Sequence, residues 1–196
     1  MAADFRIIVF TSPAHIESES DKIVRLLDHG VDIIHLRKPE GGYEDLRRLI
    51  AEIPASYHHR LRLHDHFSLA GEFDIGGFHL NSRNPNLPDY AGPVTKSCHS
   101  IGELRHTAMF EYVTLSPIFD SISKTGYRSR FDLDSLSDDL AGKHVVALGG
   151  VTPESFLVLR RKGFYGAALL GYIWDRDFET SLRFLADGIH SLQAQQ

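Results

Sequence analysis

Short apolar runs alternate with longer amphipathic segments along the whole chain. The short runs are bounded by polar or glycine-containing segments, and several are rich in β-branched or aromatic residues, which is typical of buried strands. The pattern therefore predicts eight strands, at Arg6–Phe10, Asp32–Leu36, Leu61–Leu63, Gly77–Leu80, Val94–Ser97, Tyr112–Leu115, Val145–Leu148 and Gly166–Leu170.

The longer segments between these strands carry apolar residues at helical spacing. Ser100 and Glu103 have the spacing of a capping box, and Pro153 occupies the first turn of a later segment. The segment Asn81–Gly92 is rich in Asn and Pro, so we expect a loop there in place of a helix. The predicted helices are Glu17–His29, Tyr43–Ile53, one that starts near Ser100, Thr152–Gly163 and Phe178–Leu192.

This alternation determines the predicted fold. Strands that alternate with helices are joined by crossovers and lie parallel, and eight such units predict a (β/α)8 barrel, the TIM barrel. The chain has 196 residues, which is few for this fold, so one or more helices must be short or missing. We expect residues 1–196 to form a single compact domain. An open, doubly wound parallel sheet is the alternative, because the same alternation produces it.

Charge and composition narrow the classes of function. The formal net charge is −5 and Lys and Arg are scattered, so we expect no nucleic-acid partner. We also expect no membrane association, because no apolar run approaches the roughly 20 residues that span a bilayer. Cys98 is the only cysteine, which excludes an internal disulfide and favours a cytoplasmic location. The sequence does not fix the oligomeric state and leaves a homo-oligomer open.

His35 and Arg37 lie at the end of the second predicted strand. The active site of a parallel barrel lies at the carboxyl ends of the strands. Side chains alternate along a strand, so these two share the face that points into the barrel. Polar groups there require a partner or a ligand. We interpret Arg37 as an anion-binding residue, and the alternative is a buried arginine paired with an acid on a neighbouring strand.

His64, Asp65 and His66 follow the third strand. His64 and His66 share a face, and this H-x-H spacing begins the metal site of some hydrolases, for which His79 and His99 are candidate further ligands. Asp65 could instead hold Mg²⁺. Because the chain contains 12 histidines, surface histidines without a ligand are the plain alternative.

His99 ends the fifth strand, just before a predicted helix. An imidazole ordinarily titrates near pH 6.5, which suits a general acid or base. We therefore interpret His99 as a candidate catalytic residue at the mouth of the barrel. The alternative is a solvent-facing residue beside the helix cap.

Glycines follow the last two strands. Gly149 and Gly150 end the seventh, and Gly171 comes after Leu170 at the end of the eighth. Backbone N–H groups without side chains can approach a ligand closely, and barrels of this kind often bind phosphate at these two strands. The helix start at Thr152 adds a positive dipole end nearby. We predict a phosphate site at this backbone, and the alternative is tight packing of strand against helix.

Six strand-end segments together resemble those of the thiamin phosphate synthase and TenI superfamily, and the resemblance covers nearly the whole chain. It implies a small thiazole phosphate as substrate and a substrate-covering loop after the sixth strand. The segments are His35–Pro39, His64–Asp65, Gly77–Asn84, Ser97–His99, Ser116–Lys124 and Ala147–Val151. The residues that the resemblance assigns to ligand binding are Ser97, Ser116, Ser121, Ser123 and Lys124.

The departures from the pattern of this family are also informative. Its synthases join a pyrimidine pyrophosphate to a thiazole phosphate and use Mg²⁺. A glutamine, a lysine, an asparagine and an aspartate of their pattern are replaced here by His35, Pro39, His64 and Asn84. Lys38 lies one residue from the replaced lysine, and Asp65 is the acid that remains. The changes fall mainly in the half of the site that holds pyrophosphate and Mg²⁺.

In this asymmetry the chain resembles the TenI branch of the superfamily. Members of that branch are thiazole tautomerases, which move a proton within a carboxythiazole phosphate. H-x-R at His35 and S-x-H-S at Ser97 are typical of that branch. The resemblance therefore implies a tautomerase without a cofactor, with His99, Arg37 and His35 as its catalytic group. The alternatives are a thiamin phosphate synthase that uses Mg²⁺, a catalytically silent ligand-binding or regulatory protein, and a metal hydrolase.

Overall fold

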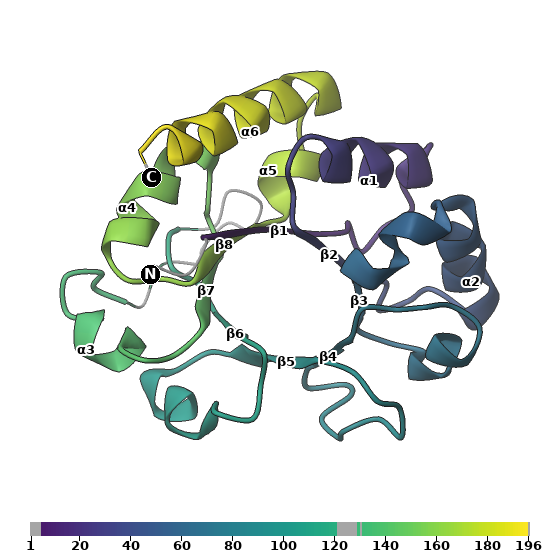
Figure 1. Ribbon diagram of the computed structural model, residues 1–196, viewed down its shortest axis with the longest axis horizontal. Helices are drawn as coiled ribbons and strands as arrows, with labels where there is room; N and C mark the ends of the chain where they lie inside the picture. The colour runs from purple at the N-terminus through teal and green to yellow at the C-terminus, as the bar shows by residue number, and fades with distance from the viewer. Residues whose placement is uncertain (1–4, 121–128, 130, 196) are drawn as a thin grey trace.

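The computed structural model describes residues 5–120, 129 and 131–195. Eight parallel strands pair in chain order and close into a barrel, because β1 pairs with both β2 and β8 (Figure 1). This confirms the predicted TIM barrel and rules out the open sheet. The strands are β1 (Arg6–Phe10), β2 (Ile33–Leu36), β3 (Leu61–Leu63), β4 (Phe78–Leu80), β5 (Val94–Cys98), β6 (Val113–Leu115), β7 (Val145–Leu148) and β8 (Gly166–Leu169).

The helices form an outer layer of uneven thickness around the strands (Figure 1). The α-helices are α1 (Glu19–Asp28), α2 (Tyr43–Glu52), α3 (Ser137–Leu140), α4 (Phe156–Arg161), α5 (Gly171–Trp174) and α6 (Phe178–Gln193). The 3-10 helices are η1 (Ala55–Arg60), η2 (Phe67–Gly71), η3 (Ile101–His106) and η4 (Pro153–Ser155). Between β4 and β5 the chain forms a loop without a helix, as the Asn- and Pro-rich segment predicted. Shortened helices thus fit the barrel into 196 residues.

The longer helices are held by their apolar faces. Ile23, Leu26 and Leu27 of α1 are buried in the core between helices and strands. Leu182 and Leu185 make the same contribution from α6. Full burial of one such side chain is worth about 1.5–3 kcal/mol, so packing rather than helix propensity fixes these segments.

Two of the predicted helices take a different form in the structure from the one that the sequence predicted. The helix expected near Ser100 is the 3-10 helix η3, in which the Glu103 carboxylate accepts bonds from the His99 N–H at 2.9 Å and the Ser100 hydroxyl at 3.2 Å. Gly102 and Thr107 are weak helix formers, which agrees with this short segment. The predicted helix Thr152–Gly163 is divided into η4 and α4, with Pro153 in its first turn as expected and a capping box of Thr152 and Ser155, which the sequence pattern did not predict, at its start.

The barrel interior contains imidazole rings as well as hydrocarbon. On β2, Ile34 and Leu36 belong to the outer core, whereas His35 points inward and stacks on Phe10 with ring centroids 4.3 Å apart. An inner apolar cluster surrounds them, made of Ile8, Phe10, Ile33, Tyr112, Val146 and Ala168. This layer supports the carboxyl ends of the strands.

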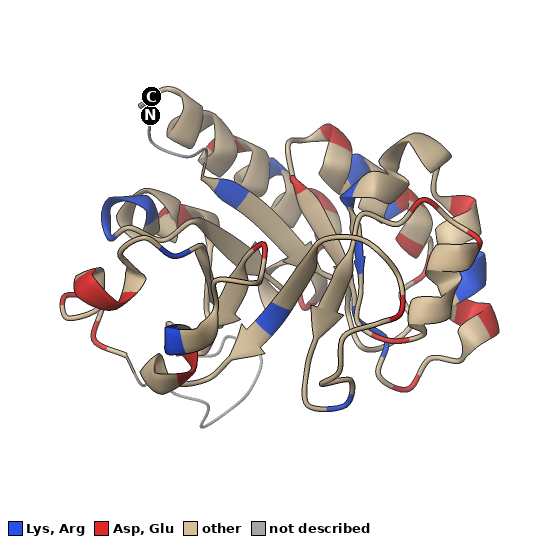
Figure 2. Ribbon diagram, turned by 60° about the horizontal axis from the view of Figure 1, so that its bottom comes forward, with Lys and Arg blue, Asp and Glu red and all other residues tan. Residues whose placement is uncertain are grey.

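The positions of basic and acidic residues are interspersed along the ribbon (Figure 2). This agrees with the scattered charge pattern of the sequence. Within the described ranges, no helix has both the length and the apolar character needed to cross a membrane.

Candidate functional site

A cavity of about 320 Å³ opens at the carboxyl ends of the strands. Residues from all parts of the barrel line it, because each strand delivers its last inward side chain to the same rim. Among the residues expected from the sequence, Arg37, Ser97, His99, Ser116, Gly149, Gly150, Leu170 and Gly171 line this cavity. Ser121, Ser123 and Lys124 lie outside the described residues.

His99 and Ser116 face each other across neighbouring strands. A hydrogen bond of 3.2 Å joins Nδ1 of His99 to Oγ of Ser116, and the Ser116 carbonyl lies 3.4 Å from the same nitrogen. His99 is exposed to solvent, and its backbone N–H donates to Glu103 at 2.9 Å. The imidazole is therefore both oriented and accessible, which is what a general acid or base requires.

Gly149 and Gly150 form a tight turn after β7. Their φ angles are 91° and 63°, in the left-handed region that favours glycine. A Cβ on Gly149 would lie 2.8 Å from the Cα of Pro117, and one on Gly150 would lie 2.2 Å from the Asp120 carbonyl oxygen. Glycine is thus required by packing against the loop after β6. The same turn lines the cavity, so it presents bare backbone there as well.

Arg37 is a half-buried cation in the wall of the cavity. Burial and, to a lesser extent, the nearby Arg83 hold the pKa of its guanidinium below the ordinary value, while Asp65 acts in the opposite direction. Among the described residues, no carboxylate forms an ion pair with Arg37. The structure thus does not contain the buried ion pair that was the alternative to anion binding.

Asp65 is already occupied by two neighbours on the loop after β4. Nη2 of Arg83 lies 3.0 Å from its Oδ2, and the Asn84 amide donates to Oδ1 at 2.8 Å. Nε of Arg83 is a further donor to Oδ1, at 3.3 Å. Both oxygens of the carboxylate therefore face hydrogen-bond donors rather than a vacant position.

This arrangement does not fit Mg²⁺. The ion needs near-octahedral oxygen ligands at about 2.0–2.1 Å, commonly from more than one carboxylate or from phosphate. Here a guanidinium lies against the single carboxylate of Asp65. The side-chain amide nitrogen of Asn84 donates both to Asp65 and to the His64 carbonyl, at 2.9 Å, so its orientation is fixed. The expected Mg²⁺ ligand Asp65 instead belongs to an ion pair.

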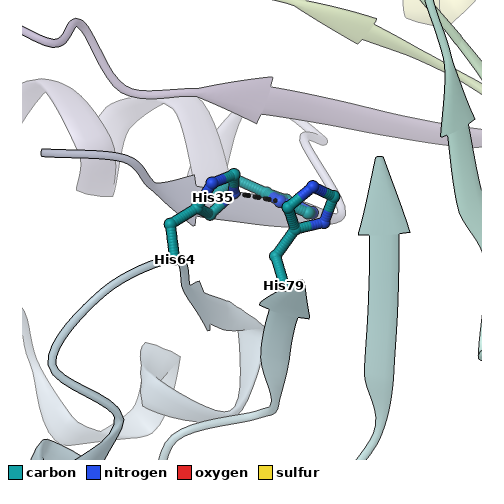
Figure 3. A group of neighbouring side chains, drawn as sticks. All are labelled: His35, His64 and His79. Atoms are coloured by element: carbon teal, nitrogen blue, oxygen red, sulfur yellow. Dashed lines mark hydrogen bonds between the residues drawn. The ribbon is translucent and has the colours of Figure 1, made fainter. Parts of the chain in front are cut away.

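His35, His64 and His79 come together inside the barrel from β2, the end of β3 and β4 (Figure 3). Nδ1 of His35 and Nε2 of His64 are 2.9 Å apart, and Nε2 of His35 is 2.5 Å from the hydroxyl of Tyr112. His79 bonds to Oγ of Ser97 at 2.8 Å. The rings thus form a hydrogen-bonded network directly beneath the cavity.

The surroundings of these three rings favour their neutral form, because they lower the pKa of each. Burial is the largest cause, and it brings the pKa of His79 to about 3. Burial together with the neighbouring His79 also holds the pKa values of His35 and His64 well below their ordinary value. His35 is fully buried and does not line the cavity, so its position does not fit the direct catalytic contact that we expected.

The three histidines have nitrogens within 4.8 Å of one another, which raises the question of a transition-metal site. A metal ion binds in the plane of each imidazole, about 2.0–2.1 Å from the nitrogen. The rings of His64 and His79 are stacked 4.2 Å apart and only 20° from parallel, so their planes do not meet within that distance. The network as it stands is a hydrogen-bonded core rather than a metal centre.

His66 does not join this group, and the expectation that it shares a face with His64 is wrong. Its backbone is in the left-handed region at φ 53°, which turns the chain away from the strand. Its Nε2 lies 2.9 Å from the Gly41 carbonyl oxygen, outside the barrel. His99 is also separate, because it pairs with Ser116. The H-x-H metal hydrolase interpretation therefore has no support in the geometry.

Lys38 cannot replace the lysine that the family pattern has at the neighbouring position. Its ammonium is buried against the carboxylate of Glu19 at 2.7 Å. It also donates to the carbonyls of Ser12 and Ala14, at 2.8 and 2.7 Å. Lys38 thus fastens the loop after β1 to α1, away from the cavity.

Sequence reasoning missed Arg83 as a site residue. It lies in the predicted loop after β4, and it lines the cavity beside Arg37. The available signal was a lone cation at the position just before Asn84, within a family segment. That signal was weak, because an arginine in a polar loop is most often solvent-exposed.

Comparison with known proteins relates this barrel to one family. The model of a family described as thiamine monophosphate synthase matches residues 7–173. A solved thiamine phosphate pyrophosphorylase from Bacteroides thetaiotaomicron is 33% identical, with a TM-score of 0.85, and the match covers 98% of this chain and 99% of that one. An Aquifex aeolicus protein provisionally named as a second thiamine-phosphate synthase is 27% identical over 164 residues, 78% of this chain and 88% of that protein.

A more distant likeness shows the fold alone. The thiamine phosphate pyrophosphorylase of Pyrococcus furiosus is 16% identical, with a TM-score of 0.77, and the match covers 96% of each chain.

Proposed function

Because the chain belongs to the thiamine monophosphate synthase family, whose enzymes serve thiamine biosynthesis, we propose that it binds a thiazole phosphate and acts as a thiazole tautomerase. The reaction moves a proton within a carboxythiazole phosphate. This assignment is narrower than the family, which includes enzymes named as synthases.

The observation that carries the proposal is the pair formed by His99 and Ser116. The imidazole is oriented by the serine at 3.2 Å, reaches solvent and lines the cavity. A proton shift requires one such acid or base over the ligand, together with cations or N–H groups for its anionic parts. Arg37 and the backbone of Gly149 and Gly150 are suited to these tasks.

In the proposed reaction, His99 removes a proton from one carbon of the ligand and returns it to another position of the same molecule. One C–H bond breaks and one new bond to hydrogen forms, so atoms and charge balance without a cofactor. The backbone after β7 and β8 holds the phosphate, and Arg37 holds the carboxylate. Positioning of this kind lowers the barrier by fixing the ligand beside the base.

A thiamine phosphate synthase is the second candidate, and the names of the relatives favour it. The solved chain that is 33% identical is called a thiamine phosphate pyrophosphorylase. Against this candidate stands the ion pair of Asp65 with Arg83, which occupies the one carboxylate that we expected to bind Mg²⁺. The two candidates share the thiazole-phosphate half of the cavity and differ in the other half.

Assays of both reactions on the purified chain, each with Mg²⁺ and with a chelator, decide between them. We expect tautomerisation at the same rate in both conditions and little coupling in either. Robust coupling that requires Mg²⁺ would overturn the tautomerase assignment. Absence of both activities, with retained affinity for thiazole phosphate, would instead indicate a silent ligand-binding protein.

A further inference from the structure

The loop after β4 holds a cation at a fixed place. Asn81 closes this loop: its Oδ1 accepts the backbone N–H of Arg83 at 3.0 Å, and its amide nitrogen donates to the His64 carbonyl at 3.1 Å. The backbones of Asn81 and Asn84 also exchange two hydrogen bonds of 3.1 Å. The guanidinium of Arg83 is then directed onto Asp65. Its position is therefore built by the fold rather than left to a free side chain.

Positive charge exceeds negative charge on this side of the cavity. Arg37 and Arg83 both line it, and among the described residues Asp65 forms an ion pair with Arg83 and not with Arg37. The neighbouring rings of His64 and His79 contribute no negative charge. The lowered pKa of the Arg37 guanidinium reflects burial and the proximity of the second cation. An anionic oxygen group placed between the two arginines would offset both the burial of the Arg37 charge and the repulsion between the two cations.

We propose that Arg83, held on Asp65, takes the place of a divalent cation and forms with Arg37 a metal-independent subsite for an anionic oxygen group of the ligand. Arg83, which follows β4, and Asp65, which follows β3, lie across the barrel from the glycine turns, because β4 and β3 are opposite β8 and β7 in the closed sheet. The ligand that fits both subsites is a small molecule with two anionic groups. The proposal goes beyond the proposed function, since it concerns how an anionic group is bound and does not depend on catalytic turnover.

A guanidinium differs from Mg²⁺ in ways that matter here. It presents planar N–H donors that match a phosphate or carboxylate, and it cannot be removed by a chelator. Arg83 uses Nε and Nη2 on Asp65 and keeps Nη1 outside those bonds. A donor edge is therefore left for the ligand, while Asp65 and Asn84 fix its direction.

The test measures binding of inorganic pyrophosphate to the full chain by calorimetry, with EDTA and with Mg²⁺. We expect binding in EDTA, with at most a twofold change on adding Mg²⁺. Arg83→Gln should weaken the binding in EDTA by about tenfold or more, because a charged hydrogen-bond donor is lost. Arg83→Lys keeps the positive charge but lacks the planar pair of N–H donors, so it should lose less affinity for pyrophosphate than Arg83→Gln does. Arg47→Gln is the matched control, since Arg47 pairs with Glu72 on the outer surface of α2.

A second measurement titrates Mn²⁺, followed by electron paramagnetic resonance, as a probe for divalent-cation binding. We expect weak binding to the unmodified chain and stronger binding to Arg83→Gln combined with Asn84→Asp, in which two carboxylates are free of the guanidinium. Pyrophosphate binding that requires Mg²⁺ in the unmodified chain, or unchanged affinity in a folded Arg83→Gln variant, would overturn the proposal. Neither result depends on catalytic turnover, so loss of the tautomerase assignment would leave this inference standing.

Discussion

His99 is the side chain that separates catalysis from simple ligand binding. It is exposed at the cavity, and among the described residues its hydrogen bonds reach the side chains of Ser116 and, through the backbone, Glu103. A residue that merely ordered the start of η3 would need the backbone bond to Glu103 but not the imidazole. The ring and the backbone of His99 can therefore be tested separately.

Replacement of His99 by Asn should lower the maximal rate of tautomerisation by about 10²–10⁴-fold, the usual contribution of general acid–base catalysis. Asparagine retains polarity near Ser116 but does not shuttle a proton. The affinity for thiazole phosphate should stay nearly unchanged, because the proposed phosphate site lies at β7 and β8. Steady-state kinetics, ligand affinity and melting temperature of this variant provide the measurement.

Two other outcomes would change the role of His99. A full maximal rate in His99→Asn would remove the residue from the mechanism. A joint fall in affinity and melting temperature, with the maximal rate retained, would make it a structural residue of the loop before η3.

Gly150 offers a second test at the scale of one residue. Gly150→Ala places a Cβ 2.2 Å from the Asp120 carbonyl oxygen at a φ of 63°. Left-handed strain costs about 1–2 kcal/mol and the backbone overlap adds about 1–3 kcal/mol. Urea unfolding should therefore show a loss of about 2–5 kcal/mol, together with weaker phosphate binding as the turn shifts.

Gly142 is the matched control for this measurement. It has a similar φ of 69°, but a Cβ there would meet nothing within 4 Å. Gly142→Ala should cost only the backbone strain, about 1–2 kcal/mol, and leave binding unaltered. Equal losses in the two variants would show that packing against the β6 loop is not what requires glycine at Gly150.

At the scale of elements, β2, β3 and β4 carry a buried polar network that an ordinary hydrophobic core would lack. Phe10, on β1, stacks on His35 and meets the edges of His64 and His79. Such a network is stable only while each ring is neutral and bonded. Its stability must therefore depend on pH.

Stability should fall as the pH drops below about 6.5, where unfolded histidines take up protons. The folded rings resist protonation because burial lowers their pKa, to about 3 for His79. The unfolded state thus binds more protons throughout this window. For His79 this should cost about 1.4 kcal/mol per pH unit once the unfolded form is charged, so its loss between pH 6.5 and 5 is about 2 kcal/mol; His35 and His64 should add to the loss in the same direction.

Urea unfolding at several pH values between 5 and 8 measures this dependence. His79→Gln is the informative variant, since glutamine has no proton to gain in this range. Below pH 6.5, the slope of its free energy of unfolding against pH should be smaller than that of the unmodified chain, by the amount that corresponds to about one proton taken up on unfolding. A slope identical to that of the unmodified chain would mean that His79 is already charged in the folded state.

The sequence predicted the strands better than the helices, and the reason is physical. Strands such as β7 are short, fully apolar and bounded by turns, so local pattern is sufficient. The short helices α3 and α5 have four residues each and take their form from packing, which a local pattern does not record. The site followed the same rule: Arg37 and His99 were found because they end strands, whereas Arg83 depends on how a loop folds back onto Asp65.

At the scale of the whole molecule, the barrel is closed by its last segments. The indole N–H of Trp174, in α5, donates to the Phe10 carbonyl at 2.7 Å, and Arg25 of α1 pairs with Glu179 of α6 at 2.5 Å. α6 also packs on η4 and α4. Because η4 follows the turn at Gly149 and Gly150 directly, α6 supports the candidate phosphate site from outside.

Gly188, in the middle of α6, tests this support. Alanine is ordinarily better than glycine in a helix by about 1 kcal/mol. Here, however, a Cβ would lie 2.7 Å from the Cβ of Pro153, a rigid ring atom of η4. Gly188→Ala should therefore destabilise the fold by about 1–3 kcal/mol in urea unfolding, because overpacking outweighs propensity. It should also weaken phosphate binding.

Ser191→Ala is the control for this variant. It changes an exposed position of the same helix and should alter stability by no more than about 0.5 kcal/mol. A stabilised Gly188→Ala variant would show that α6 can move off η4 freely, and the phosphate turn would then depend on the β6 loop alone.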